Sequence, residues 1–303
     1  MNCENKSLTN DIFLRESLSL KKLFAMRTKI FYPVAFLALS AALITGGCKN
    51  RENANKNIGA EEITPLENKQ EIKKQVKEFL YPLPTTLEVV QMLQDIGISY
   101  IIGISNPTEN VNKYMSSRSK AMALGVYGAD LSYASVYNMQ QDVISYLDVI
   151  RKLAGELYLQ DVYNEKIVER INNNLNNKDS LVNILTNVLF ESYNKLNRNG
   201  KGDIALMMVT GGWVEALYLT THVSANSYDN YELVKIIAGQ KESLDKLMDV
   251  LNERKDDDPA ILDLIETLQP LQDLYNKAGD SMTEKQLHAI SVETEKIRNK
   301  LLS

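Results

Sequence analysis

The sequence predicts an all-α protein, a multi-helix bundle. Apolar residues recur at helical spacing through almost the whole chain after residue 70. The intervening segments are short and rich in Pro, Gly, Asn and Asp, which end helices or form turns. Only the run ISYIIGIS, residues 98–105, has strand character, and it is equally consistent with a buried helical turn.

The first boundaries come from prolines and capping residues. The sequence YPLPTT, residues 81–86, places two prolines and then threonine before an apolar-periodic run, and Gly97 can end that run. NRNGKGD, residues 197–203, has the composition of a loop. Pro259 suits the first turn of a helix, and Ser281 or Thr283 can cap another. We therefore expect helices at 70–80, 85–96, 107–138, 140–158, 163–174, 179–197, 203–224, 228–253, 259–277 and 283–302.

The chain also has the pattern of an internal duplication. GVYGADLSYASVYN (125–138) aligns with TGGWVEALYLTTHV (210–223), and two weaker echoes follow in the same order: 146–157 with 231–244, and 191–196 with 273–278. Repeats at a fixed period indicate repeated structural units. We expect two tandem units of about four helices, 119–198 and 204–280. The alternative is chance matching of Tyr, Leu and Lys, which are common on helices.

Each aligned segment carries a stripe of polar and aromatic side chains. Positions i, i+4, i+7 and i+11 share one helix face. The stretch 204–221 holds a single acid, so that helix reads as buried, and a buried carboxyl needs a hydrogen-bonding partner. We expect one polar site between the two helices, with raised carboxyl pKa values, formed by Asp130, Tyr133, Tyr137, Glu215, Tyr218 and His222.

Three interpretations of this stripe stay open. Buried acid and tyrosine side chains can simply join two helices, they can bind a ligand, or two carboxyls can act as general acid and base. Glu215 is expected to be hydrogen-bonded by a tyrosine hydroxyl such as that of Tyr133 or Tyr218. No metal or other cofactor is expected, because the two histidines, His222 and His288, match no metal-binding motif.

Small residues on the same helices point to close packing. Glycine inside a helix costs about 1 kcal/mol relative to alanine, so several in one helix suggest a compensating contact. We expect another helix to approach closely at Gly125, Gly128, Ser132, Ser135, Gly211, Gly212, Ala216 and Thr220.

The N-terminal part of the chain has the features of an export signal. Residues 26–29 are basic, residues 30–44 are almost wholly apolar, and TGGC ends at Cys48. This pattern resembles the bacterial lipobox, with Thr45 in place of the usual leucine, which implies cleavage before Cys48 and lipid attachment to it. The alternative is an ordinary signal or a single membrane anchor. We interpret 1–25 as an extension upstream of the true start at Met26, 26–47 as a lipoprotein signal, 48–69 as a flexible tether and 70–303 as the helical domain.

Composition restricts the partners. The chain has 34 basic and 39 acidic residues and a net charge of −5, and no basic patch interleaved with aromatics, which argues against nucleic acid as a partner. Its two cysteines are Cys3 and Cys48, so residues 49–303 have no thiol chemistry.

Read together, the lipobox, YPLPTTLEVVQMLQDIG, the segment 105–138 and GGWVEALYLTTH resemble a family of predicted helical lipoproteins of Bacteroidetes-type bacteria. The resemblance implies an envelope location, an all-helical domain and no assigned activity. We expect a membrane-tethered binding or scaffold module of the outer membrane, on its periplasmic face, with the cell surface left open. Its partners would be the membrane, through the lipid anchor, and an envelope protein or small ligand. The alternative is a hydrolase or ligand-binding protein that uses Asp130 and Glu215.

Overall fold

A computed structural model describes residues 86–223, 229–278 and 282–303, all within one compact unit that spans 61–303. The expected signal at 26–47, its upstream extension, Cys48, the tether and the helix at 70–80 lie outside the described residues.

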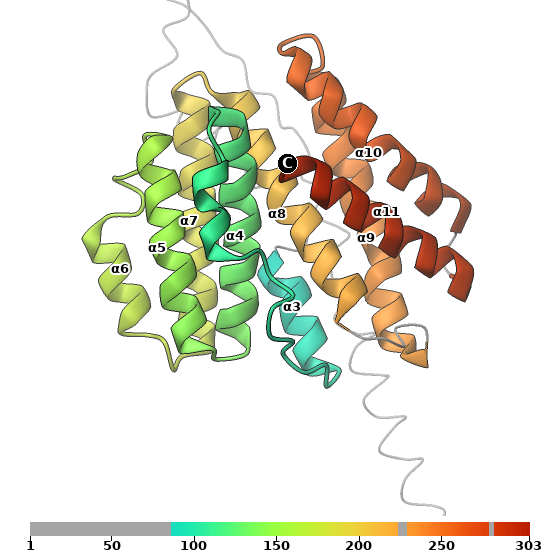
Figure 1. Cartoon of the computed structure of the whole chain (residues 1–303), viewed down its shortest axis with the longest axis horizontal. Helices are drawn as coiled ribbons and strands as arrows, with labels where there is room; N and C mark the ends of the chain where they lie inside the picture. Colours follow the sequence, from blue (N-terminus) through green and yellow to red (C-terminus); the bar gives the residue numbers. More distant parts are fainter. Residues whose placement is uncertain (1–85, 224–228, 279–281) are drawn as a thin grey trace, which may run out of the picture. The chain divides into compact units, whose positions relative to one another are not determined.

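The described residues form an all-α multi-helix bundle, as the sequence predicts (Figure 1). The region 98–105 contains turns rather than a strand. In chain order the elements are α3 (Thr86–Asp95), the 3-10 helix η1 (Thr108–Lys113), α4 (Ser117–Val136), α5 (Gln140–Glu156), α6 (Glu165–Asn172), α7 (Lys178–Arg198), α8 (Gly202–His222), α9 (Tyr231–Glu253), α10 (Pro259–Ala278) and α11 (Glu284–Leu301).

The expectation of one helix over 107–138 was wrong. The chain forms η1, then extended backbone at Tyr114, and starts α4 only after Ser116. The Ser116 hydroxyl accepts from the Ser119 backbone N–H, and the Ser119 hydroxyl accepts from the Ser116 N–H, which makes a capping box. Tyr114, buried in this break, packs edge-on against Tyr127. The break therefore gives the Ser119 N–H, in the first turn of α4, a hydrogen-bond partner, and η1 packs on α5.

Most other boundaries match the expected ones because the capping residues act as the sequence suggests. Thr283 caps α11 in a capping box with Gln286, and Pro259 begins α10. Gly97 and Gly200 have φ of +81° and +70°, a conformation that favours glycine after a helix end.

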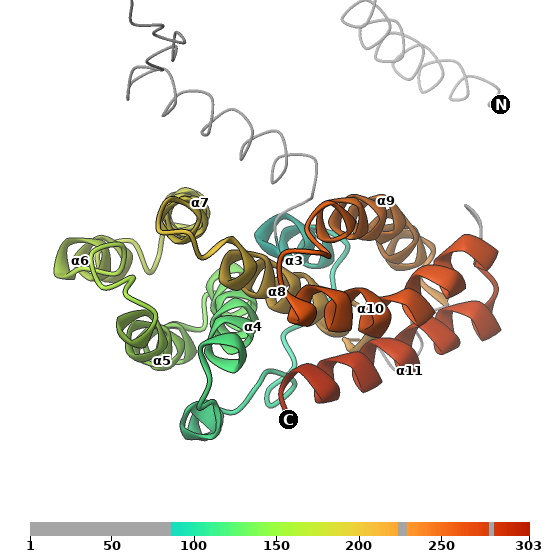
Figure 2. The ribbon, with the colours of Figure 1, turned by 90° about the horizontal axis from the view of Figure 1, so that it is seen from above.

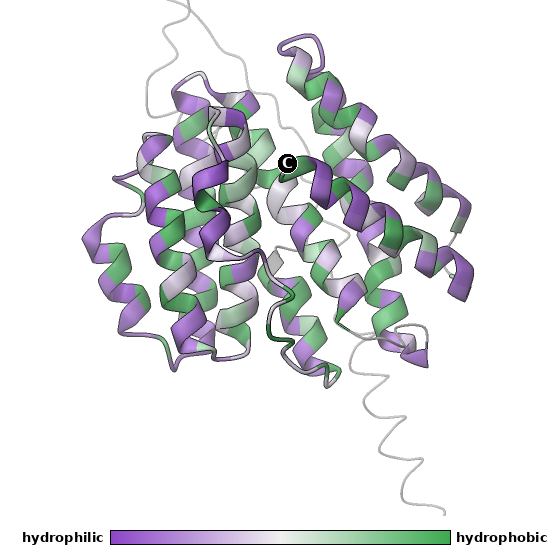
Figure 3. Ribbon diagram, viewed as in Figure 1, coloured by the Kyte–Doolittle hydropathy of each residue, from purple (hydrophilic) through white to green (hydrophobic). Residues whose placement is uncertain are grey.

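Helices α4 and α8 pack directly on each other at the centre of the bundle. Figures 1 and 2 show α5, α6 and α7 on the α4 side of this pair, and α9, α10 and α11 on the α8 side. Every residue of α8 from Ile204 to Leu217 is buried. That helix is also long and apolar enough to cross a membrane, but 89% of its apolar window is covered by the rest of the bundle. Figure 3 shows the contrasting pattern in α6, α10 and α11, where hydrophilic and hydrophobic residues alternate.

Three glycines make the close approach of α4 and α8 possible. A Cβ on Gly125 would lie 1.9 Å from the Met208 carbonyl oxygen, and one on Gly211 would lie 2.3 Å from the Met122 carbonyl oxygen. A Cβ on Gly212 would stand 3.2 Å from the Gly125 oxygen. The expected small-residue contact is confirmed at these positions. It is wrong for Gly128, around which a Cβ would meet no atom within 4 Å.

The two central helices are among the most buried, as expected for the proposed duplication. Within each stripe the aromatic pair that the alignment matches is in contact: Tyr133 of α4 with the C-cap residue Tyr137, and Tyr218 with His222 in α8. Superposition of 119–198 on 204–280 stays a prediction.

Candidate functional site

Glu215 is fully buried in α8 and forms an ion pair with Arg298 of α11. Arg298 Nε donates to Glu215 Oε2 at 2.5 Å, and a terminal guanidinium nitrogen donates to Oε1 at 2.8 Å. This two-point geometry is the strongest that an arginine and a carboxylate can form. The burial of Glu215 was expected, but the tyrosine partner was the wrong expectation, because the guanidinium occupies both carboxylate oxygens.

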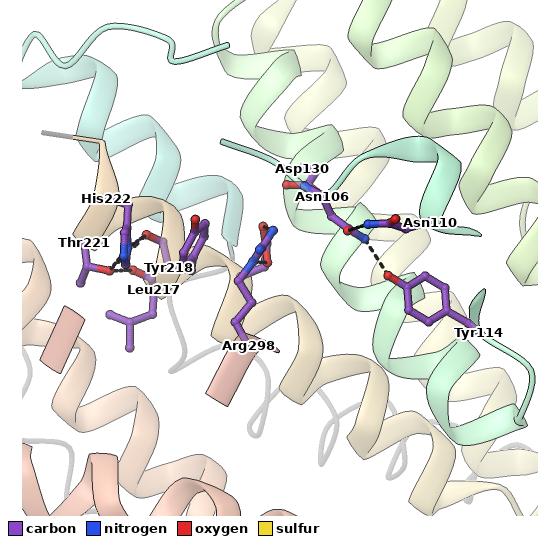
Figure 4. A network of polar contacts seen from close by, with 10 residues as sticks. Asn106, Asn110, Tyr114, Asp130, Leu217, Tyr218, Thr221, His222 and Arg298 are labelled. Carbon is purple, nitrogen blue, oxygen red and sulfur yellow. Dashed lines mark hydrogen bonds and ion pairs between the residues drawn. The ribbon is translucent and has the colours of Figure 1, made fainter. Parts of the chain in front are cut away.

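Asp130 of α4 belongs to the same buried cluster. Its Oδ2 accepts from the Asn106 backbone N–H at 3.1 Å, while Oδ1 has no hydrogen-bond partner of good geometry among the described residues. The Asn106 side chain is fixed in turn, because its amide donates to the Tyr114 hydroxyl and its Oδ1 accepts from Asn110. Figure 4 shows Arg298 between this group and the aromatic pair of α8.

The electrostatics of the cluster raise the pKa of both acids and of the arginine that lies beside them. Burial raises the pKa of Asp130 well above its usual range, and the neighbouring charge of Glu215 raises it further. Burial also raises the pKa of Glu215, but the hydrogen bonds and charge of Arg298 oppose that rise. Arg298 stays charged, since Glu215 more than offsets the effect of burial and raises the pKa of the guanidinium above its ordinary value. Both carboxyls thus have raised pKa values, and Arg298 opposes the rise most directly at Glu215, to which it is hydrogen-bonded.

Tyr133 of α4 and Tyr137, the residue at the C-terminal end of α4, face the loop after α3 rather than the carboxyls. The Tyr133 hydroxyl accepts from the Ile101 backbone N–H at 2.8 Å, and the Tyr137 hydroxyl donates to the Ile98 carbonyl at 2.7 Å. Tyr100 of the same loop stacks on Tyr133 with ring centres 4.6 Å apart. These two residues therefore hold the loop on α4, and the expected convergence on the acids is wrong for both.

The aromatic residues of α8 lie on the other side of Arg298. The guanidinium carbon is 4.1 Å from the centre of the Tyr218 ring, a cation–π contact. The His222 ring stacks on the Tyr218 ring, with the two ring centres 4.2 Å apart. His222 Nδ1 is 2.9 Å from the Tyr218 carbonyl oxygen, and its Nε2 is 3.4 Å from the Ser291 hydroxyl. Tyr218 thus packs on the guanidinium and His222 packs on Tyr218, while the hydrogen bonds of Glu215 come from Arg298.

Sequence reasoning missed Arg298, although a signal for it exists. Leu287, Ile290, Thr294 and Ile297 form the buried face of α11. Arg298 lies four residues after Thr294 and eight after Ile290, so it belongs to that face. A basic residue within an apolar stripe indicates a buried anionic partner.

The arrangement is suited to holding three helices together. Both carboxyls have no exposed surface, and the Arg298 side chain keeps only 11% of its own. No group of three or more His, Cys, Asp or Glu side chains that could hold a metal occurs among the described residues. A substrate would have to displace Arg298 or the 105–106 backbone to reach either acid.

Comparison of the chain with protein-family models, with curated proteins and with solved structures finds no match.

Proposed function

We propose that this protein is an envelope lipoprotein, anchored through a lipid on Cys48, whose helical domain acts as a binding or scaffold module rather than as an enzyme. The sequence pattern before Cys48 is the basis for the anchor. We place the protein at the outer membrane, on the periplasmic face, with envelope proteins or a small ligand as partners.

The sealing of Asp130 and Glu215 is the observation that carries the non-enzymatic part of this proposal. A general acid or base must come within hydrogen-bond reach of the group that it protonates or deprotonates. Here Arg298 covers Glu215, and Asn106 covers one oxygen of Asp130. The hydrolase alternative needs these carboxyls at a surface, so their burial favours the module.

The anchor is tested by metabolic labelling with palmitate in a host that processes bacterial lipoproteins. Cys48→Ala should abolish the label and release the protein from the membrane fraction. The control is a chain that starts at Met26, which lacks Cys3, the only other cysteine, and keeps the whole expected signal. It should keep both label and fractionation. Label that persists in Cys48→Ala would exclude this anchor.

The face of the membrane is tested by protease treatment of whole cells. A periplasmic protein should resist the protease until the outer membrane is opened. Digestion in intact cells would place the protein on the cell surface and contradict the periplasmic assignment.

A further inference from the structure

A partly enclosed cavity of about 110 Å³ lies beside the α4–α8 crossing, away from the ion pair. Its walls come from α3, α4, α7 and α8, with smaller contributions from α5, α9 and Tyr163. Most of the lining side chains are apolar, with leucine and valine the most frequent, and no charged residue lines the cavity. For scale, an engineered apolar cavity of about 150 Å³ takes up benzene. The space therefore suits several carbon atoms of an uncharged molecule.

The wall of this cavity contains a buried hydrogen-bond donor that has no partner among the described residues. Trp213 of α8 lines the cavity and is only 6% exposed, and its Nε1–H has no acceptor among the described residues. Buried indole N–H groups usually find a partner. The Ser132 hydroxyl also lines the wall, but it already donates to the Gly128 carbonyl oxygen.

On the α4 side, the cavity has unfilled space because Gly128 has no side chain. Gly128 lines the cavity, and a Cβ at this position would meet no atom within 4 Å. Close packing between α4 and α8 explains Gly125 but not Gly128. Glycine within a helix is unfavourable by about 1 kcal/mol relative to alanine. At Gly128 no close helix contact compensates for this, and the missing side chain instead leaves part of the cavity empty.

We infer that this cavity binds the acyl part of a neutral ester lipid, with the ester carbonyl accepting a hydrogen bond from Trp213 Nε1. The apolar lining selects a hydrocarbon chain. The unpaired indole N–H selects an acceptor, and the lack of any charged lining residue excludes a free carboxylate, whose charge would be buried without a partner. On the α7 side the half-buried Leu185, Leu189 and Phe190 continue the apolar wall for a longer chain. This inference goes beyond the proposed anchor and does not depend on whether Cys48 is modified.

The single tryptophan of the chain makes the site directly observable. The full chain with Cys48→Ala, purified without detergent, would be labelled with ¹⁵N at the indole, so that one cross-peak reports Trp213. Methyl hexanoate should bind saturably and move the indole proton downfield, as a new hydrogen bond does. Toluene, which has no such acceptor, should bind without that downfield shift. Hexanoate at neutral pH should bind at least about tenfold more weakly than its methyl ester.

A pair of glycine variants tests the location. Gly128→Leu should fill the cavity and weaken methyl hexanoate binding by about tenfold or more. Gly239→Leu is the matched control, since Gly239 is an exposed residue of α9 whose Cβ position is also open, and binding there should stay within about twofold of the parent. An unmoved indole peak, equal binding of hexanoate, or undiminished binding in Gly128→Leu would each overturn the proposal. The ligand series on the parent chain decides it alone if Gly128→Leu does not fold.

Discussion

Replacing Arg298 with methionine removes the one cation from a buried cluster that holds two acids. Methionine keeps most of the length and apolar surface of the arginine stem, so the change acts mainly on charge. Glu215 then loses both hydrogen-bond donors that occupy its oxygens, and it stays next to Asp130 with no exposed surface. Removal of one partner from a buried ion pair costs about 3–5 kcal/mol of unfolding free energy.

The penalty should depend strongly on pH. Burial raises the pKa of both Asp130 and Glu215, and without Arg298 the main contributions that oppose the rise at Glu215 are lost. A carboxyl with a higher pKa in the folded chain adds stability below its unfolded pKa, about 4, and that stability is lost as the pH rises through the folded pKa. The cost of Arg298→Met should therefore be small near pH 4 and grow toward pH 7. The slope is at most about 1.36 kcal/mol per pH unit for each proton.

Urea unfolding of Arg298→Met and the parent at pH 4, 5.5 and 7 measures this difference. Arg118 provides the matched control, because it also makes two hydrogen bonds to a carboxylate, that of Asp258, but its side chain is 53% exposed. Exposed ion pairs contribute about 0–1 kcal/mol, so Arg118→Met should cost little at any of these pH values.

The reasoning would be refuted by an Arg298→Met penalty that equals the Arg118→Met penalty at pH 7, or by one that does not change with pH. Glu215→Gln sharpens the comparison. It leaves Arg298 beside Asp130, which can ionise and replace the lost charge, so the expected cost is only about 1–3 kcal/mol.

Asp130→Asn should flatten the pH dependence of stability, because folding raises the pKa of this acid and the stability that the raised pKa contributes is lost as the pH rises. Urea titrations from pH 4 to 7 measure this, and a pH dependence equal to that of the parent would contradict it. Gly125→Ala should lower the free energy of unfolding by about 1–3 kcal/mol or more, because its Cβ would meet a backbone oxygen of α8. Gly128→Ala should raise the free energy of unfolding by up to about 1 kcal/mol, because its Cβ meets nothing. Equal unfolding midpoints of the two variants would contradict the packing argument. Tyr137→Phe should lose about 1 kcal/mol and speed amide hydrogen exchange in the loop at 98–103, and unchanged exchange there would show that the hydroxyl does not hold the loop.

The helices were predictable from the sequence because residues close to each helix end determine where the helix starts or stops. Thr283, Pro259 and Gly97 act within one turn of themselves, so neighbouring residues suffice to place a boundary. The break before α4 was missed because serine is an ordinary residue within a helix, and only the reciprocal bonds of Ser116 and Ser119 make it a start.

The candidate site was only partly predictable, for a reason of distance along the chain. The burial of Asp130 and Glu215 follows from the apolar helices that contain them. Their partners do not, since Arg298 lies 83 residues after Glu215, and Asn106 contributes a backbone N–H that any residue would supply. Helical spacing placed Tyr133 and Tyr137 on one face with Asp130, but it could not show that long side chains on that face reach different neighbours.

The separation between Glu215 and Arg298 also sets an order of events during synthesis. At roughly 5–20 residues per second, the ribosome adds the 83 residues between them in roughly 4–17 seconds. Throughout that interval α8 has been made but its counter-charge has not. The helix must then stay in contact with water or hold its acid in protonated form, because burial of the bare carboxylate is too unfavourable. With Glu215 ionised, the centre of the bundle can therefore close only after α11 has been made, although the two helices that form it are complete much earlier.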